Sequence, residues 1–157
     1  MDAILKAAIW SFLPISELRG GIPIALHNGL NIWLAYIICV CANLLVIPWT
    51  YFFLDHLHEI FMKVSVYKRI FNSYVEKKRT SLEKHIGTKW EFIALAFFVG
   101  VPLPVTGAYT GTLLAWFFKI PRKKAYASVA LGVVIAGLIV TLVIQLGLKA
   151  FSIFVKG

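Results

Sequence analysis

Charged residues and cysteines are scarce in this sequence, and each shortage excludes a class of protein. Only 15% of the 157 residues are charged, which is too few for an intrinsically disordered chain. Two cysteines cannot form a disulfide framework, and 11 glycines exclude a collagen-like repeat. Cys39 and Cys41 lie two positions apart in an apolar stretch, so they face different sides of a helix and predict no metal site.

Hydrophobic residues, by contrast, are abundant. They make up 60% of the chain, and the mean hydropathy is +0.82. A soluble core of this size cannot hide so much apolar surface, so water is not the main solvent. We therefore expect an all-α polytopic membrane protein that forms a single membrane domain over residues 1–157.

The net charge of +9 is concentrated in two places. Eight of the 16 lysines and arginines fall between Lys63 and Lys89, and four fall between Lys119 and Lys124. Both clusters flank long apolar stretches, which is typical of loops on the cytoplasmic side of a bilayer. No nucleic-acid motif accompanies them, so the pattern predicts membrane lipids rather than nucleic acid as partners.

The first half contains a broken apolar stretch, a long apolar stretch and a basic segment. Residues 3–28 are predicted to form a helical hairpin, because Pro14 interrupts two pieces that are each too short to cross a hydrocarbon core of about 30 Å. Residues 30–54 carry no charge and are long enough to cross. Residues 55–89 have apolar side chains at steps of three and four, which predicts a basic amphipathic helix along the membrane surface. Asp2 and the absence of a basic start argue against a cleaved signal peptide.

The second half repeats this pattern at an offset of 90 residues. A second hairpin is predicted over residues 91–118, and a second crossing helix over residues 125–148. The offset aligns Leu13-Pro14-Ile15-Ser16 with Leu103-Pro104-Val105-Thr106, and Ala35-Tyr36 with Ala125-Tyr126. We therefore predict two duplicated units, residues 1–54 and 90–157.

The charges also predict how the two units lie in the membrane. If each hairpin is re-entrant and returns to the side that it came from, residues 55–89 and 119–124 all stay in the cytoplasm, as the positive-inside rule requires. A hairpin that crossed completely would place residues 119–124 outside. We therefore expect an inverted repeat in the cytoplasmic (inner) membrane, with the basic linker facing the cytoplasm. Two crossings and two hairpins are few to enclose a path, so we also expect an isologous homodimer.

The two breaks form the predicted functional centre. Non-helical backbone halfway through a membrane is tolerated only where protein buries it or where it lines a wet cavity. The breaks should therefore meet each other or an aqueous site. Ser16 and Thr106 are the expected N-caps of the half-helices that follow. Both half-helices would point their positive ends at the membrane centre, where an anion or polar headgroup could bind.

Glu17 and Arg19 are the charged residues expected inside the hydrocarbon, where each costs about 2.5 to 3.5 kcal/mol on insertion scales. A carboxyl at a helix N-terminus, balanced between the helix dipole and desolvation, could carry a proton. The Arg19 guanidinium suits phosphate or carboxylate oxygens. The alternative role is structural, because the two side chains diverge on a helix and could lock the hairpin through partners in the other unit.

Further candidates surround this pair. Hydroxyl groups for a polar pocket are expected from Thr106, Tyr109, Thr110 and Thr112, and Asn43 in the first crossing helix is a secondary candidate. The turn and close-packing positions are Pro14, Gly20, Gly21, Pro23, Pro102, Pro104, Gly107 and Gly111. A face of small residues should seat another helix or a second protomer, and it consists of Ala125, Ser128, Gly132 and Ala136.

Enzymatic chemistry is not expected. No hydrolase, kinase or dinucleotide-binding motif is present, and no serine or cysteine has an evident basic partner. His56 and His58 lie two positions apart and diverge on a helix, which predicts interfacial residues rather than metal ligands. The sequence therefore indicates neither an enzyme nor a bound cofactor or metal.

Two motifs resemble those of a bacterial and archaeal family, the small multidrug export proteins. They are Glu17-Leu18-Arg19-Gly20-Gly21-Ile22-Pro23 and the stretch from Pro102 to Gly111, and the similarity covers essentially the whole chain. The layout also resembles that of the DedA membrane proteins, whose paired re-entrant hairpins are associated with phospholipid or polyprenyl-phosphate translocation. The first resemblance implies export.

Three functions are consistent with these features. The first is a secondary transporter, in which Glu17 couples export of a small or amphipathic solute to protons. The second is a lipid flippase or scramblase, in which Arg19 and the half-helix ends hold a phosphate headgroup. The third is a non-transporting assembly subunit that recruits a partner through residues 57–89. Arg19 favours an anionic substrate, whereas the family resemblance suggests cationic drugs.

Overall fold

The computed structural model describes residues 2–61, 89–103 and 106–156, and the regular elements in these ranges are all helices. Residues 62–88, which make up most of the predicted amphipathic linker, lie outside the described residues, as do Pro104 and Val105. The helices are α1 (Ala3–Phe12), α2 (Glu17–His27), α3 (Ile32–Leu44), α4 (Val46–Phe61), α6 (Lys89–Gly100), α7 (Ala108–Phe117) and α8 (Arg122–Lys156).

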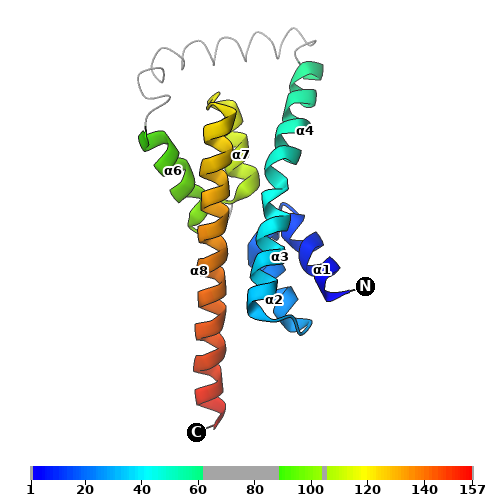
Figure 1. Ribbon diagram of the computed structural model, residues 1–157, viewed down its shortest axis with the longest axis vertical. Helices are drawn as coiled ribbons and strands as arrows, with labels where there is room; N and C mark the ends of the chain where they lie inside the picture. The colour runs from blue at the N-terminus through cyan, green and yellow to red at the C-terminus, as the bar shows by residue number, and fades with distance from the viewer. Residues whose placement is uncertain (1, 62–88, 104–105, 157) are drawn as a thin grey trace.

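Two helical hairpins lie toward opposite ends of the molecule. The pair α1 and α2 opens toward the end at which α3 begins, and the pair α6 and α7 opens toward the end at which α8 begins (Figure 1). The turns of both hairpins lie near the middle of the molecule (Figure 1). Helix α8 packs against helices of both hairpins, so it joins the two halves.

Two stretches are long and apolar enough to cross a membrane. Ile32–Leu57 spans α3 and most of α4 with a mean hydropathy of 2.1, and Arg122–Gly147 in α8 has a mean hydropathy of 2.7. Each contains 26 residues, or about 39 Å of helix, which exceeds a hydrocarbon core of about 30 Å. Helix α4 continues to Phe61 without a break, so residues 55–61 extend the first crossing helix.

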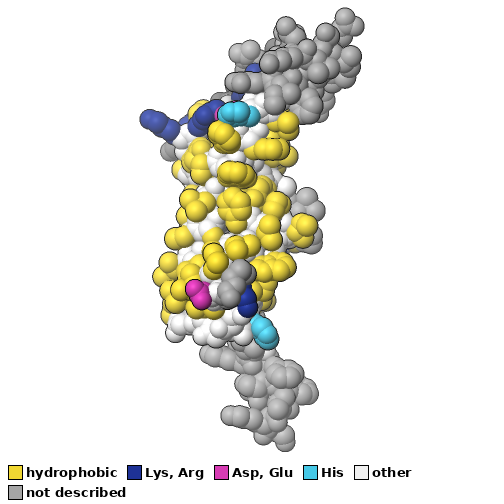
Figure 2. Space-filling model, turned by 90° about the vertical axis from the view of Figure 1, so that its right-hand side faces the viewer, with side chains coloured by type: hydrophobic (Ala, Val, Ile, Leu, Met, Phe, Trp, Pro, Cys, Tyr) yellow, Lys and Arg dark blue, Asp and Glu magenta, His cyan; other side chains and the backbone are white. Residues whose placement is uncertain are grey.

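The outer surface of the bundle is apolar around its middle. Figure 2 shows hydrophobic side chains covering the central part of one face, with basic side chains and histidine near both ends of that region. Leu45, Phe52, Leu142 and Val143 are each more than half exposed. Water does not accommodate an apolar surface of this extent, whereas the hydrocarbon of a bilayer does. The fold is therefore that of an all-helical membrane protein.

The predicted face of small residues on α8 is buried inside the chain. Ala125 and Ser128 are fully buried, and Gly132 packs directly against α6. A Cβ atom at Gly132 would lie 2.6 Å from Cβ of Val99 and 2.8 Å from the backbone oxygen of Ala96. The face therefore seats a helix of the same chain, because only a hydrogen atom fits between the two backbones.

The 90-residue offset recurs in the hydrogen bonds that end α2 and α7. The Leu30 amide donates to Ala25 O at 3.1 Å, and the Ile120 amide donates to Ala115 O at 2.9 Å. The residues just before these donors, Gly29 and Lys119, have φ values of 82° and 55°, as the Schellman motif requires. Helices α3 and α8 then begin at residues 32 and 122. The local backbone thus has the same geometry at equivalent positions of the two halves.

We expect Gly132→Ala to lower the melting temperature of the protein in detergent. The added methyl group overlaps backbone as well as side-chain atoms of α6, and overpacking of this kind costs about 1–3 kcal/mol. Gly147→Ala is the matched control, because a Cβ atom there meets nothing within 4 Å and the gain in helix propensity is the same. Equal melting temperatures for the two variants would contradict the close packing of α6 on α8.

Candidate functional site at the hairpin tips

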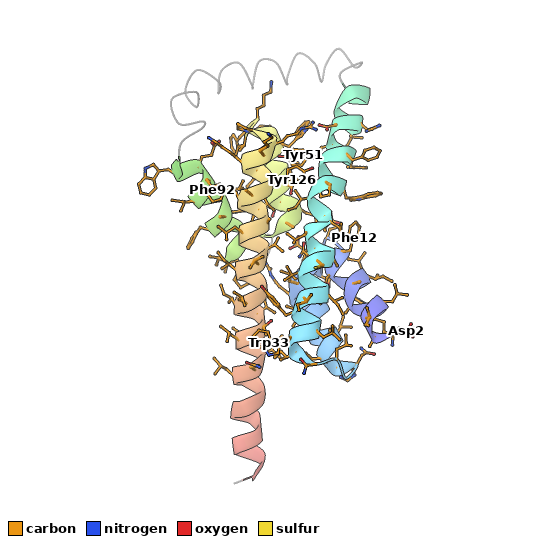
Figure 3. The ribbon with its side chains drawn as sticks, in the orientation of Figure 1. Asp2, Phe12, Trp33, Tyr51, Phe92 and Tyr126 are labelled. Atoms are coloured by element: carbon orange, nitrogen blue, oxygen red, sulfur yellow. The ribbon has the colours of Figure 1, made fainter. Side chains whose placement is uncertain are left out.

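The tips of the two hairpins contact each other near the middle of the molecule. Figure 3 shows Phe12, the last residue of α1, near mid-height, whereas Trp33 and the Tyr51–Tyr126 pair lie toward opposite ends. The Tyr109 hydroxyl of α7 donates a hydrogen bond of 2.7 Å to the backbone oxygen of Phe12. Residues almost 100 positions apart in the sequence are therefore brought together at the tips.

The Glu17 carboxylate lies at the N-terminus of α7, in the opposite hairpin. Its Oε1 atom accepts a hydrogen bond of 3.4 Å from the Tyr109 amide, and a backbone hydrogen bond from Ala108 reaches the same carboxylate. A Cβ atom at Gly107 would overlap this carboxylate, so only glycine fits beside it. The negative charge of Glu17 thus occupies the position at which a helix N-terminus favours an anion.

The backbone of Glu17 has an unusual conformation. Its φ is 45°, in the left-handed region that residues other than glycine seldom adopt. Such a conformation costs about 1–3 kcal/mol and persists only where the surroundings impose it. The hydrogen bonds across to α7 supply such a constraint, because they hold the side chain of Glu17 at the tip of the other hairpin.

Arg19 links the tips a second time through Thr106. Its Nη2 atom donates to the backbone oxygen of Thr106 and, at 3.2 Å, to the Thr106 hydroxyl. That hydroxyl also donates to Val101 O at 2.7 Å and accepts from the Leu103 amide at 3.1 Å. The prediction that Thr106 is the N-cap of its half-helix is wrong, because Gly107 holds that position and the Thr106 hydroxyl organises the preceding turn instead.

Equivalent positions of the two halves make the same kind of contact with different chemistry. Arg19 and Tyr109 are 90 residues apart, and each donates across the molecule to a backbone oxygen at the tip of the other hairpin. Glu17 aligns with Gly107 at the same offset, and the carboxylate of the first lies over the backbone of the second. Charge therefore comes from the first hairpin, and room for it comes from the second.

A small cavity beside the tips contains one further polar group. Glu17, Arg19, Thr106 and Asn43 all line it, and its volume is about 10 Å³, close to the minimum that holds one water molecule. Asn43 is 1% exposed, and neither its amide nitrogen nor its amide oxygen has a hydrogen-bond partner in the described part of the chain. A buried amide without a partner costs about 1–3 kcal/mol, so this side chain is well placed for a water or a ligand.

The remaining predicted hydroxyl groups do not line this cavity. Ser16 stands at the N-cap position of α2, but its hydroxyl makes no capping bond and has no partner among the described residues. The Thr110 and Thr112 hydroxyls donate to backbone oxygens within their own helix region, Gly107 O at 3.3 Å and Ala108 O at 2.6 Å. Of the predicted hydroxyls, only that of Thr106 therefore lies on the cavity wall.

The predicted turn and packing residues have several different roles. Gly21 allows close packing of α2 on Ser11 of α1, Gly111 packs against Val99 of α6, and Gly20 lies beside Ser16 in its own helix. Pro14 and Pro23 are exposed, and Pro102 lines the cavity. Pro104 lies outside the described residues.

Sequence reasoning missed a polar cluster at the end of the bundle where α8 begins. Asp55 of α4 accepts a hydrogen bond of 3.0 Å from the Trp116 indole and forms an ion pair of 2.7 Å with Arg122. The Arg122 guanidinium lies 5.5 Å from the centre of the Tyr51 ring. The only available signal was that an acidic and a basic residue border the two crossing stretches, which does not indicate that they pair. Sequence reasoning also missed the Ala108 and Tyr109 amides as partners of Glu17, because backbone groups are the same for almost every residue type.

The comparisons with known proteins give one match. The model of a family described as small multi-drug export proteins matches residues 17–139, which is more than half of the chain. The match includes Glu17, Arg19, Asn43 and the tip of the second hairpin, and it begins just after the turn of the first hairpin. No curated protein and no solved structure matches the chain.

We expect Thr106→Val to destabilise the protein by about 1–3 kcal/mol, because it removes the hydrogen bonds of the Thr106 hydroxyl with Arg19, Val101 O and the Leu103 amide. Thr106→Ser keeps the hydroxyl group and should retain most of the stability. Thermal unfolding of both variants in detergent measures the difference. A loss in the serine variant that equals or exceeds the loss in the valine variant would contradict the main role of the hydroxyl, because serine lacks only the methyl group.

Proposed function

The chain belongs to the small multi-drug export protein family, and we propose that it is a proton-coupled exporter whose substrate passes between the tips of the two hairpins. The family name and the two long apolar stretches indicate a membrane transport role. The contacts between the hairpin tips and the distribution of charge support this proposal.

We propose that residues 1–54 and 90–157 are inverted repeats with re-entrant hairpins. The opposite directions of the hairpins (Figure 1) and the repeated hydrogen bonds at the ends of α2 and α7 support this arrangement. Basic residues 119–124 would then lie in the cytoplasm, together with the linker, and the protein would span the inner membrane. Two protomers would be needed to enclose a complete path.

The observation that carries the proposal is the position of the Glu17 carboxylate on the N-terminus of α7. An ionised carboxylate accepts backbone hydrogen bonds about twice as strongly as a neutral group does. When Glu17 is ionised, its charge therefore holds the two tips together. When a proton neutralises Glu17, this attraction weakens and the tips can separate.

Separation of the tips would open the substrate site. The cavity of about 10 Å³ beside Glu17 is too small for a solute, so the described conformation is closed. Parting of the tips would expose the Asn43 amide, the Arg19 guanidinium and the α7 N-terminus, which together can bind a polar or charged group. Proton binding and substrate access would thus be linked through one contact, as coupled transport requires.

The test is transport by purified protein in proteoliposomes under an imposed pH gradient, with ethidium as a cationic probe and carboxyfluorescein as an anionic probe. Glu17→Gln should abolish the dependence on the gradient, because the amide oxygen still accepts the α7 hydrogen bonds but no longer exchanges a proton. Asp2→Asn is the control, since Asp2 is exposed and its side chain makes no capping bond. Gradient-dependent transport that survives in the glutamine variant would exclude Glu17 as the coupling group.

A second candidate function is translocation of lipid headgroups. Arg19 and the α7 N-terminus lie together near the middle of the molecule, and both bind phosphate oxygens well.

The same vesicles, prepared with fluorescent phosphatidylglycerol, test this second function through the exposure of the labelled headgroup to an external quencher. Arg19→Ala should slow the exchange about tenfold or more, as expected for the loss of one charge-assisted hydrogen bond. Exchange at the unaltered rate would remove the support for this function.

A further inference from the structure

An open groove separates α8 from the junction of α3 and α4, away from the hairpin tips. Its volume is about 660 Å³, and one wall is formed by Leu44 and Ile47. The opposite wall is formed by Tyr126, Ala127 and Ala130 of α8. These two walls are apolar, and the groove lies between the two stretches that are long enough to cross a membrane.

Small side chains produce the hollow on the α8 side. Lys123, Ala127 and Ala130 are spaced by four and three residues, so they lie on one face of the helix. Ala127 and Ala130 leave open space beside this face, which larger side chains would fill. From Lys123 to Ala130 the helix rises about 10 Å, so the groove runs from the start of α8 toward the middle of the bundle.

The end of the groove at the start of α8 is positively charged. Arg122 and Lys123 line the groove there, and Lys123 is exposed. The ion pair with Asp55 and the contact with the Tyr51 ring fix the Arg122 guanidinium in place. The ion pair with Asp55 uses the Nη2 atom of Arg122, and a guanidinium has five N–H donors, so others can bind a further anion.

We propose that this groove binds an anionic phospholipid, with one acyl chain against the alanine face and the phosphate against Lys123 and Arg122. The charge supports a lipid over a second copy of the chain. A protomer packed into the groove would have to bury Lys123, whereas a lipid places its phosphate beside it. This site shares no lining residue with the cavity at the hairpin tips, so the inference does not depend on the proposed transport function.

The test is native mass spectrometry of the full-length protein in detergent, titrated with phosphatidylglycerol and, separately, with phosphatidylcholine. Lys123→Gln should weaken binding of phosphatidylglycerol about fivefold, the effect of about one surface cation, and should leave phosphatidylcholine unchanged. Ala127→Leu should weaken binding of both lipids, because the larger side chain fills the groove.

Two control variants make the result specific. Lys119→Gln removes a positive charge near the same end of the bundle, but Lys119 does not line the groove, so binding should stay the same. Val143→Phe adds bulk at an exposed position of α8 outside the groove and should also have no effect. Equal weakening by the Lys119 and Lys123 variants would reduce the site to general attraction and overturn the proposal. A shift from dimer to monomer in Ala127→Leu, with lipid binding retained, would overturn it in favour of a protomer interface.

Discussion

The backbone at each hairpin tip is broken inside an apolar bundle, and the arrangement of the helices depends on how the broken ends are satisfied. Each tip supplies partners for the other: Glu17 accepts from the α7 N-terminus, Tyr109 donates to the end of α1, and Arg19 donates to the turn before α7. Separating the tips without replacing these partners would leave polar groups in apolar surroundings, which is costly. The contact therefore holds the two hairpins together at their tips.

The two halves share a backbone frame but not the chemistry of their tips. If both halves carried a glutamate at the position of Glu17, two carboxylates would approach each other at the centre and repel. Gly107 avoids this repulsion and makes room for the one carboxylate that is present. Tyr109 likewise replaces a second guanidinium with a neutral donor. Among the described residues that make contacts between the two tips, Glu17 and Arg19 are therefore the charged ones, and both belong to the first hairpin.

The polar contacts at the tips and at the start of α8 differ in what would break them. At the tips, one partly buried carboxylate and two side-chain donors bind backbone groups of the opposite hairpin. At the start of α8, Asp55 joins Arg122 and Trp116 and ties α4, α7 and α8 together in a partly exposed position. In the proposed transport cycle the tips would move while this end stays joined. The positively charged end of the groove between α8 and the α3–α4 junction lies at the same end of the bundle, because Arg122 both lines the groove and pairs with Asp55.

The sequence by itself determined the helical class, the positions of the breaks and the lengths of the apolar stretches, because hydrophobic length and proline act locally along the chain. It also singled out Glu17 and Arg19, since charge in an apolar stretch needs no tertiary information to be noticed. The partners of these residues were decided by the tertiary structure alone. Thr106 was expected to cap its own helix, yet it binds Arg19, and Asp55 pairs with Arg122 without any local signal. Such pairings join segments that are some 60 to 90 residues apart, and they exist only once the helices have packed.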